Sequence, residues 1–90
     1  MIDLFTHEYM AALVKIPSRQ QRNSIQAHRK WSGDNYYPSL HFKKLNTKEK
    51  KWYCLRVSDE YRTLGFREGE IIKRHWIGPR YEYDEYIKKL

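Results

Sequence analysis

The sequence predicts an α+β domain: a small antiparallel sheet, which a strand at the N-terminus can make mixed, two N-terminal helices packed on one face, and a short C-terminal helix. Residues 52–77 fall into three runs of alternating side chains separated by turn residues, and residues 6–31 carry apolar side chains at helical spacing. A Gly-Pro pair precedes the final aromatic and charged stretch. Ninety residues allow one core, so residues 1–90 are expected to form a single domain.

The N-terminal third is expected to hold an edge strand and two helices. Residues 2–5 can form the strand, and Thr6 can cap a helix that Pro17 ends. Ser18, with a glutamine three residues later, has the pattern of a capping box, so a second helix is expected over about residues 19–31. Its inner side should include Ile25, Ala27 and His28, and the sequence Gly33-Asp34-Asn35 should end it.

The remaining sequence predicts a loop, a three-stranded meander and the last helix. Residues 35–51 form the loop, with a short extended piece around residues 40–42. Alternation predicts strands at residues 52–57, 61–66 and 71–77, with tight turns at 58–60 and 67–70. Gly78 breaks the third strand, and Pro79 suits the first position of a helix.

Composition narrows the possible partners. A formal net charge of +7 in so short a chain attracts polyanions, and 16% aromatic residues add stacking surfaces, so RNA, DNA or an acidic protein is expected as partner. No apolar run approaches the roughly 20 residues that cross a bilayer, and the N-terminus lacks the order of a signal peptide, which predicts a soluble, cytoplasmic protein that does not bind membranes. A single cysteine, Cys54, and four histidines without ligand spacing predict neither a disulfide nor a metal site, and no cofactor is expected.

Two arginines are candidates for phosphate binding. Arg62 lies early in the middle strand of the meander and Arg80 just beyond its neighbour, so strand pairing could bring both guanidinium groups to one concave surface. Their forked donors match phosphate geometry, and both stay charged at neutral pH. The alternative is that Arg62 pairs with Glu60 or Glu82 and only holds the sheet together.

The segments WYCLRVSDEYRTLGF and WIGPRYEYDEYI resemble the C-terminal half of the RelE/ParE toxin superfamily, in particular its RelE-like branch. The resemblance covers roughly residues 39–87. It implies that Arg62, in a Tyr-Arg dipeptide, stabilises the cleaved phosphate and that Arg80 acts as acid or phosphate ligand. It also implies that Tyr86 stacks on a base or assists proton transfer. Members of a closer branch commonly have histidine at the position of Arg80, so an imidazole is not available there.

The chain departs from the family pattern in the first strand of the meander, where the best-known branch has a pair of lysines that act as base. The substitutes near that strand are Arg56, His41, Lys43, Lys44, Lys50 and Lys51. A lysine would serve as base only if neighbouring cations lowered its pKa. The four lysines and Tyr83 are also the expected RNA contacts.

The resemblance implies the toxin of a type II toxin–antitoxin system, an endoribonuclease that cleaves mRNA held in the ribosome by metal-independent attack of a 2′-hydroxyl. It implies a small acidic antitoxin as partner, besides mRNA and the ribosome. Two alternatives stay open: a ParE-like protein that inhibits DNA gyrase by binding it, and a catalytically inactive member that only binds RNA.

Overall fold

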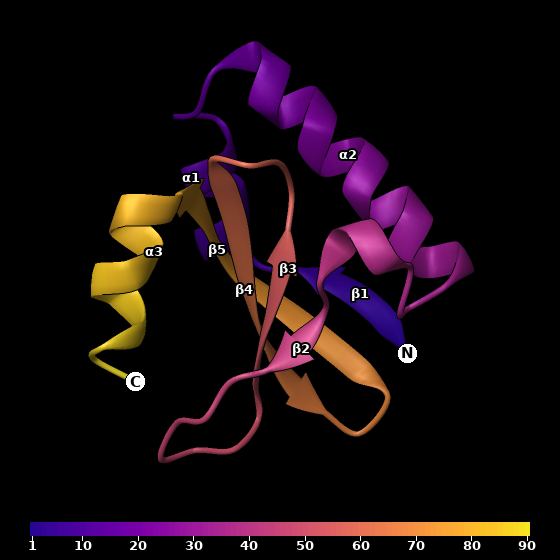
Figure 1. The fold of residues 1–90 in the computed structure, drawn as a ribbon, viewed down its shortest axis with the longest axis vertical. Coiled ribbons are helices and arrows are strands. Elements are labelled where there is room, and N and C mark those ends of the chain that lie inside the picture. Colours follow the sequence, from indigo (N-terminus) through magenta and orange to yellow (C-terminus); the bar gives the residue numbers. More distant parts are fainter.

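The computed structural model describes all residues, 1–90, and contains one five-stranded mixed sheet in the order β1-β5-β4-β3-β2 (Figure 1). β1 runs parallel to β5, and the other neighbouring strands are antiparallel. The predicted α+β class and the joining of an N-terminal strand to the meander are confirmed. The elements are β1 (Ile2–Phe5), α1 (His7–Leu13), α2 (Ser18–Gly33), a 3-10 helix (Pro38–Leu40), β2 (Lys43–Lys44), β3 (Trp52–Arg56), β4 (Tyr61–Glu68), β5 (Ile71–Pro79) and α3 (Arg80–Ile87).

Helices cover both faces of the sheet, because successive strand residues point to opposite sides. Leu55 of β3 packs in a cluster with Trp31 of α2, whereas its neighbour Cys54 packs with Tyr83 of α3. In Figure 1 the long helix α2 and the C-terminal helix α3 accordingly lie on different sides of β3 and β4. None of the helices combines the length and the apolar character that crossing a bilayer requires.

The helix limits correct part of the sequence prediction. Thr6 caps α1 as predicted, since its side chain accepts a hydrogen bond from the N–H of Tyr9. The predicted capping box is wrong, because Ser18 is already helical and Pro17 occupies the N-cap position. Ile25 is also not on the inner side: its side chain is 50% exposed. The buried side of α2 instead comprises Ser24, Ala27, His28 and Trp31.

The loop and the meander also differ in detail from the prediction. The expected extended piece around residues 40–42 is the end of the 3-10 helix, followed by His41 in the left-handed conformation with φ of 45°. β4 extends to Glu68 because the turn after it narrows to Gly69 and Glu70, with Gly69 at φ of 61°. The prediction that Gly78 breaks the third strand is wrong, since β5 continues to Pro79 through pairing of Gly78 with Arg62. Pro79 is the N-cap of α3 and not its first helical residue. A register shift opposite Leu64 and Gly65 leaves His75 as an extra residue in β5.

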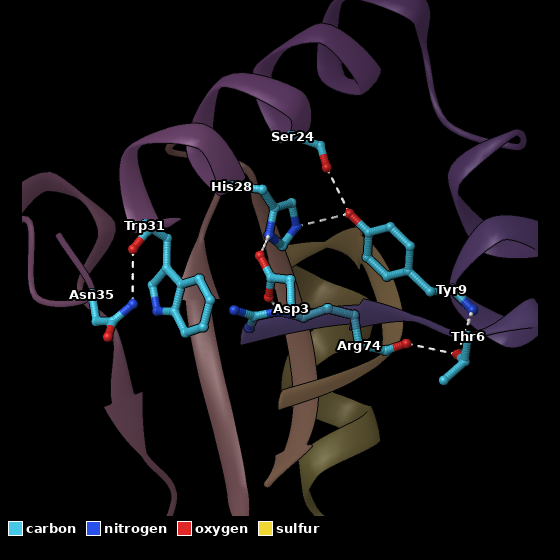
Figure 2. A network of polar contacts seen from close by, with 8 residues as sticks. All are labelled: Asp3, Thr6, Tyr9, Ser24, His28, Trp31, Asn35 and Arg74. Atoms are coloured by element: carbon cyan, nitrogen blue, oxygen red, sulfur yellow. Dashed lines mark hydrogen bonds and ion pairs between the residues drawn. The ribbon is translucent and has the colours of Figure 1, made fainter. Parts of the chain in front are cut away.

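A buried polar network joins β1, α1, α2 and β5 (Figure 2). The Nε of Arg74, which is fully buried, donates to Asp3 Oδ1 at 2.6 Å, and Asp3 Oδ2 lies 3.0 Å from Nδ1 of His28. The hydroxyl of Tyr9 lies 3.1 Å from Nε2 of His28 and 2.6 Å from Oγ of Ser24. The network therefore fixes Asp3 of the first strand to residues that follow it by 25 and 71 positions.

Charge and hydrogen bonding in the network follow from burial. Burial lowers the pKa of His28, so the ring is neutral at neutral pH. A carboxylate can only accept, so Nδ1 carries the proton and donates to Asp3, while Nε2 accepts from Tyr9. The two terminal nitrogens of Arg74 have no hydrogen-bond partner. Its guanidinium lies instead 4.8 Å from the ring centre of Trp31.

Candidate functional site

Strand register brings three arginines to one end of the sheet. Arg56 of β3 is the register partner of Arg62 on β4, and Arg62 is the partner of Gly78 on β5. Because Arg56 and Arg62 lie two residues from Cys54 and Leu64, both belong to the face that α3 covers. The N–H of Arg80 donates to the carbonyl of Glu60 at 2.7 Å, which holds the start of α3 beside the β3–β4 turn.

Arg62 is half-buried and has no carboxylate partner. Its Nη1 donates to the carbonyls of Ser58 at 2.5 Å and Tyr61 at 3.0 Å. Burial lowers the pKa of Arg62, and repulsion from Arg80 and Arg56 lowers it further. At neutral pH the group nevertheless stays protonated. The alternative in which Arg62 pairs with Glu60 or Glu82 is wrong.

The other two arginines differ in their partners. Arg80 is exposed and forms no ion pair. Arg56 pairs with Asp59, and its Nη1 donates to the carbonyl of Ser39 at 3.2 Å. Arg56 therefore ties the 3-10 helix to the end of β3, whereas Arg62 and Arg80 keep uncompensated charge.

His41 belongs to the same end of the sheet. β2 pairs with β3 only at Lys43, opposite Cys54, and at Lys44. His41 precedes this strand as the exposed, left-handed residue that ends the 3-10 helix, two residues after Ser39, whose carbonyl accepts from Arg56. Lys43 lies on the same face of the sheet as Arg56, one cross-strand pair away.

The other lysines lie elsewhere. Lys44 is the partner of Tyr53 and belongs to the opposite face of the sheet. Lys50 and Lys51 precede β3, at roughly 15 Å or more along the strand from Arg56. The Nζ of Lys51 lies 5.9 Å from the ring centre of Phe66. Of the predicted lysines, only Lys43 adjoins the arginines.

The tyrosines of α3 divide into buried and exposed positions. Tyr83 is 8% exposed and packs with Cys54 and Leu64, and this burial raises its pKa. Because the helix turns this side chain to the sheet, little of Tyr83 is exposed for the predicted RNA contact, which stays a prediction. Tyr81, next to Arg80, takes the outward position and is 71% exposed. Sequence reasoning did not separate the two, since both flank Glu82 in an alternating run.

Tyr86 is half-buried and held by an aromatic contact. Its ring centre lies 5.4 Å from that of Trp76, with 33° between the planes. Trp76 in turn lies over Gly78, where an added Cβ would meet its ring at 2.4 Å. Gly78 thus leaves space for the indole that supports Tyr86, and Tyr86 keeps a partly open face beside the sheet.

The arrangement can bind a phosphodiester through Arg62 and Arg80. No group of three or more His, Cys, Asp or Glu side chains is placed to hold a metal ion. An anionic ligand is the chemical class that these uncompensated cations favour.

Comparisons with known proteins identify the fold. No family model matches the sequence, and no curated protein matches it. A RelB-RelE antitoxin-toxin complex from Methanococcus jannaschii matches with a TM-score of 0.73 at 18% identity, over 92% of this chain and 96% of that chain. The toxin-antitoxin complex RelBE2 from Mycobacterium tuberculosis gives 0.70 at 20% identity, over 88% and 96%. The DinJ-YafQ toxin-antitoxin complex from E. coli gives 0.66 at 12%, over 91% and 93%. The chain has the RelE-like toxin fold.

Proposed function

We propose that this chain is the toxin of a type II toxin–antitoxin pair and that it cleaves mRNA held in the ribosome without a metal ion. One observation carries the proposal: Arg62 and Arg80 lie at the same end of the sheet, and neither forms an ion pair. The structures that share the fold are described as toxins or toxin-antitoxin complexes, which supports the class.

The proposed reaction is attack of a ribose 2′-oxygen on the adjacent phosphorus. The new P–O2′ bond forms, the P–O5′ bond breaks, and the products are a 2′,3′-cyclic phosphate and a 5′-hydroxyl. Negative charge builds on the phosphoryl oxygens, and the guanidinium of Arg62 is fixed in place by the carbonyls of Ser58 and Tyr61 to stabilise it. Exposed Arg80 would neutralise charge on the leaving O5′, which takes its proton from water because arginine stays protonated.

The proposed proton acceptor for the 2′-hydroxyl is His41, since it ends the 3-10 helix that Arg56 contacts through Ser39, and an imidazole is a common general base. Lys43 is the alternative base, on the face that bears the arginines. Tyr86 would stack on a base through its open face.

The proposed antitoxin is a small acidic protein with apolar side chains. The net charge of +7 favours an acidic partner. A groove of about 740 Å³ between β1, α1 and α2 is lined mainly by apolar side chains, and its rim exposes Ile2, Phe5, Met10 and Ile25. Exposed apolar side chains gathered in one groove indicate a protein contact surface. If an adjacent gene encodes a small acidic protein, co-expression with that protein should restore growth, and Ile25→Glu should abolish the rescue.

The activity can be tested by primer extension on a translated mRNA, in EDTA, with and without ribosomes. New 5′ ends are expected only with ribosomes. Arg62→Ala and Arg80→Ala should each reduce cleavage by about 100-fold or more. Arg22→Ala, an exposed arginine on α2 without an ion pair, is the matched control and should cleave normally.

Two results would contradict the proposal. If both arginine variants fold, as measured by circular dichroism, and still cleave mRNA at the wild-type rate, the site assignment is wrong. If the wild-type protein cleaves mRNA in none of the conditions, the proposed reaction is wrong. Inhibition of DNA gyrase would then be the favoured function, and a DNA supercoiling assay would test it.

A further inference from the structure

Two adjoining hollows lie beside Arg80. The smaller has a volume of about 360 Å³, and its lining consists of Asp59, Glu60, Tyr61, Pro79, Arg80 and Tyr81. The larger, of about 540 Å³, lies between α1 and the junction of β5 with α3, and it shares Tyr61, Pro79 and Tyr81 with the smaller. Volumes of this order fit one small organic group. Arg80 of the proposed phosphate-binding site lines the smaller hollow, while Tyr61 points to the opposite face of the sheet from Arg62, its neighbour in β4.

Two tyrosines form the walls that the hollows share. Tyr61 is the register partner of Pro79, so the strand pair fixes its backbone, and its side chain is half-buried. Tyr81 is 71% exposed, contacts no other aromatic ring, and its hydroxyl forms no hydrogen bond within the protein. An exposed aromatic ring beside an arginine is the arrangement on which unpaired bases stack.

The lining of the smaller hollow combines the cation Arg80 with a carboxylate that could accept a hydrogen bond from a base. Glu60 in the smaller hollow has no ion-pair partner, although the protein carries an excess of seven positive charges. The other carboxylate there, Asp59, is paired with Arg56. A free carboxylate repels phosphate but accepts hydrogen bonds from the exocyclic amino groups of cytosine, adenine and guanine. Uracil has no exocyclic amino group and could donate to the carboxylate only through its ring N3–H.

We propose that these hollows are a base-recognition subsite, in which one base next to the scissile phosphate stacks on Tyr81 and Tyr61 while Glu60 accepts a hydrogen bond from its amino group. The subsite would select an amino-bearing base over uracil. It rests on the proposed RNA-cleaving function, and it is separate from the position of Tyr86, which lies more than one helical turn from Arg80 along α3.

The test measures binding without cleavage. Fluorescently labelled 2′-O-methyl trinucleotides with A, C, G or U at the centre cannot be cleaved, and anisotropy gives their affinity for the full chain. Wild-type protein should bind the A, C and G probes more tightly than the U probe. Tyr81→Ala should weaken binding of those three by roughly 5- to 150-fold, the range for loss of one stacked base, whereas Tyr81→Phe should retain it.

The carboxylate variant tests selectivity. Glu60→Gln should bring the four affinities together, while Arg62→Ala should weaken all four alike. Tyr36→Ala, a 65% exposed tyrosine outside the hollows, and Glu49→Gln, an exposed carboxylate on the β2–β3 loop without an ion pair, are matched controls and should leave the affinities unchanged.

The outcomes separate this subsite from the cleavage reaction. Equal binding of all four probes by wild-type protein, no binding of any probe, or an unchanged preference in Glu60→Gln would overturn the subsite even if the protein cleaves mRNA. A preference that Tyr81→Ala and Glu60→Gln remove would support the subsite even if primer extension finds no cleavage.

Discussion

Removal of the Asp3 carboxylate by Asp3→Ala should destabilise the protein by about 3–5 kcal/mol, the usual cost of stranding one partner of a buried ion pair. Arg74 is fully buried, and Asp3 is the only acceptor for its guanidinium, because both terminal nitrogens are without partners. His28 loses its acceptor in the same variant. For a chain of 90 residues, a loss of that size lowers Tm by about 12 °C or more. It is a large part of the whole free energy of unfolding, which is roughly 5–15 kcal/mol for a domain.

Urea unfolding at pH 7.5, followed by circular dichroism, measures this loss. Asp84→Ala removes an exposed carboxylate without an ion pair and should change stability by less than about 0.5 kcal/mol. The double variant Asp3→Leu with Arg74→Met removes both charges and should be more stable than Asp3→Ala by several kcal/mol. A loss below about 1 kcal/mol in Asp3→Ala, or a double variant no better than the single one, would refute the assignment of the cost to a stranded buried charge.

Three further predictions concern pH, packing and salt. The pKa of His28 is lowered in the folded state, so the unfolded state binds a proton at this residue more readily. The free energy of unfolding should therefore be greatest above the ordinary pKa of 6.5 and fall as pH drops below it. Urea midpoints measured from pH 8 to 5 should fall less in His28→Gln than in the wild-type protein. Gly78→Ala should cost about 1–3 kcal/mol and change tryptophan fluorescence, because the new Cβ meets the ring of Trp76 at 2.4 Å, whereas Gly33→Ala, with no atom within 4 Å, should not destabilise; equal stability of the two variants would contradict this packing. Arg80→Ala should reduce the slope of log K against log salt for single-stranded RNA by about 0.7, and an unchanged slope would show that Arg80 does not contact phosphate.

The sheet could be predicted because its signals are local. The three strands of the meander alternate in sequence, and their order places Arg62 next to the chain that leads to Arg80. The structure has both residues at one end of the sheet, while their role in cleavage stays a prediction. The end of β4 was predicted less well. Gly69 adopts a positive φ and permits a shorter turn than the polar residues around it predicted.

The errors come from partners distant in sequence. Ile25 was expected on the inner side of α2. Ser24 and His28 lie on that side instead of Ile25, and both form hydrogen bonds with Tyr9 of α1. Likewise, Tyr83 faces inward because Cys54 and Leu64 of the sheet receive it, and no short-range pattern distinguishes it from Tyr81. Lys50 and Lys51 precede β3, so the length of this strand separates them from Arg56 at its other end. Their closeness to Arg56 in sequence therefore did not predict closeness in space.

The parallel pairing of β1 with β5 makes the order of synthesis matter. Ile2 pairs with Ile71 and Phe5 with Arg74, so the first strand made has no neighbour in the sheet until most of the chain exists. Such non-local pairing closes late in folding. A chain that stops before residue 71 lacks three things: Arg74, which pairs with Asp3; β5, which pairs with β4; and Arg80. Residues 71–90 therefore complete both the core and the proposed site.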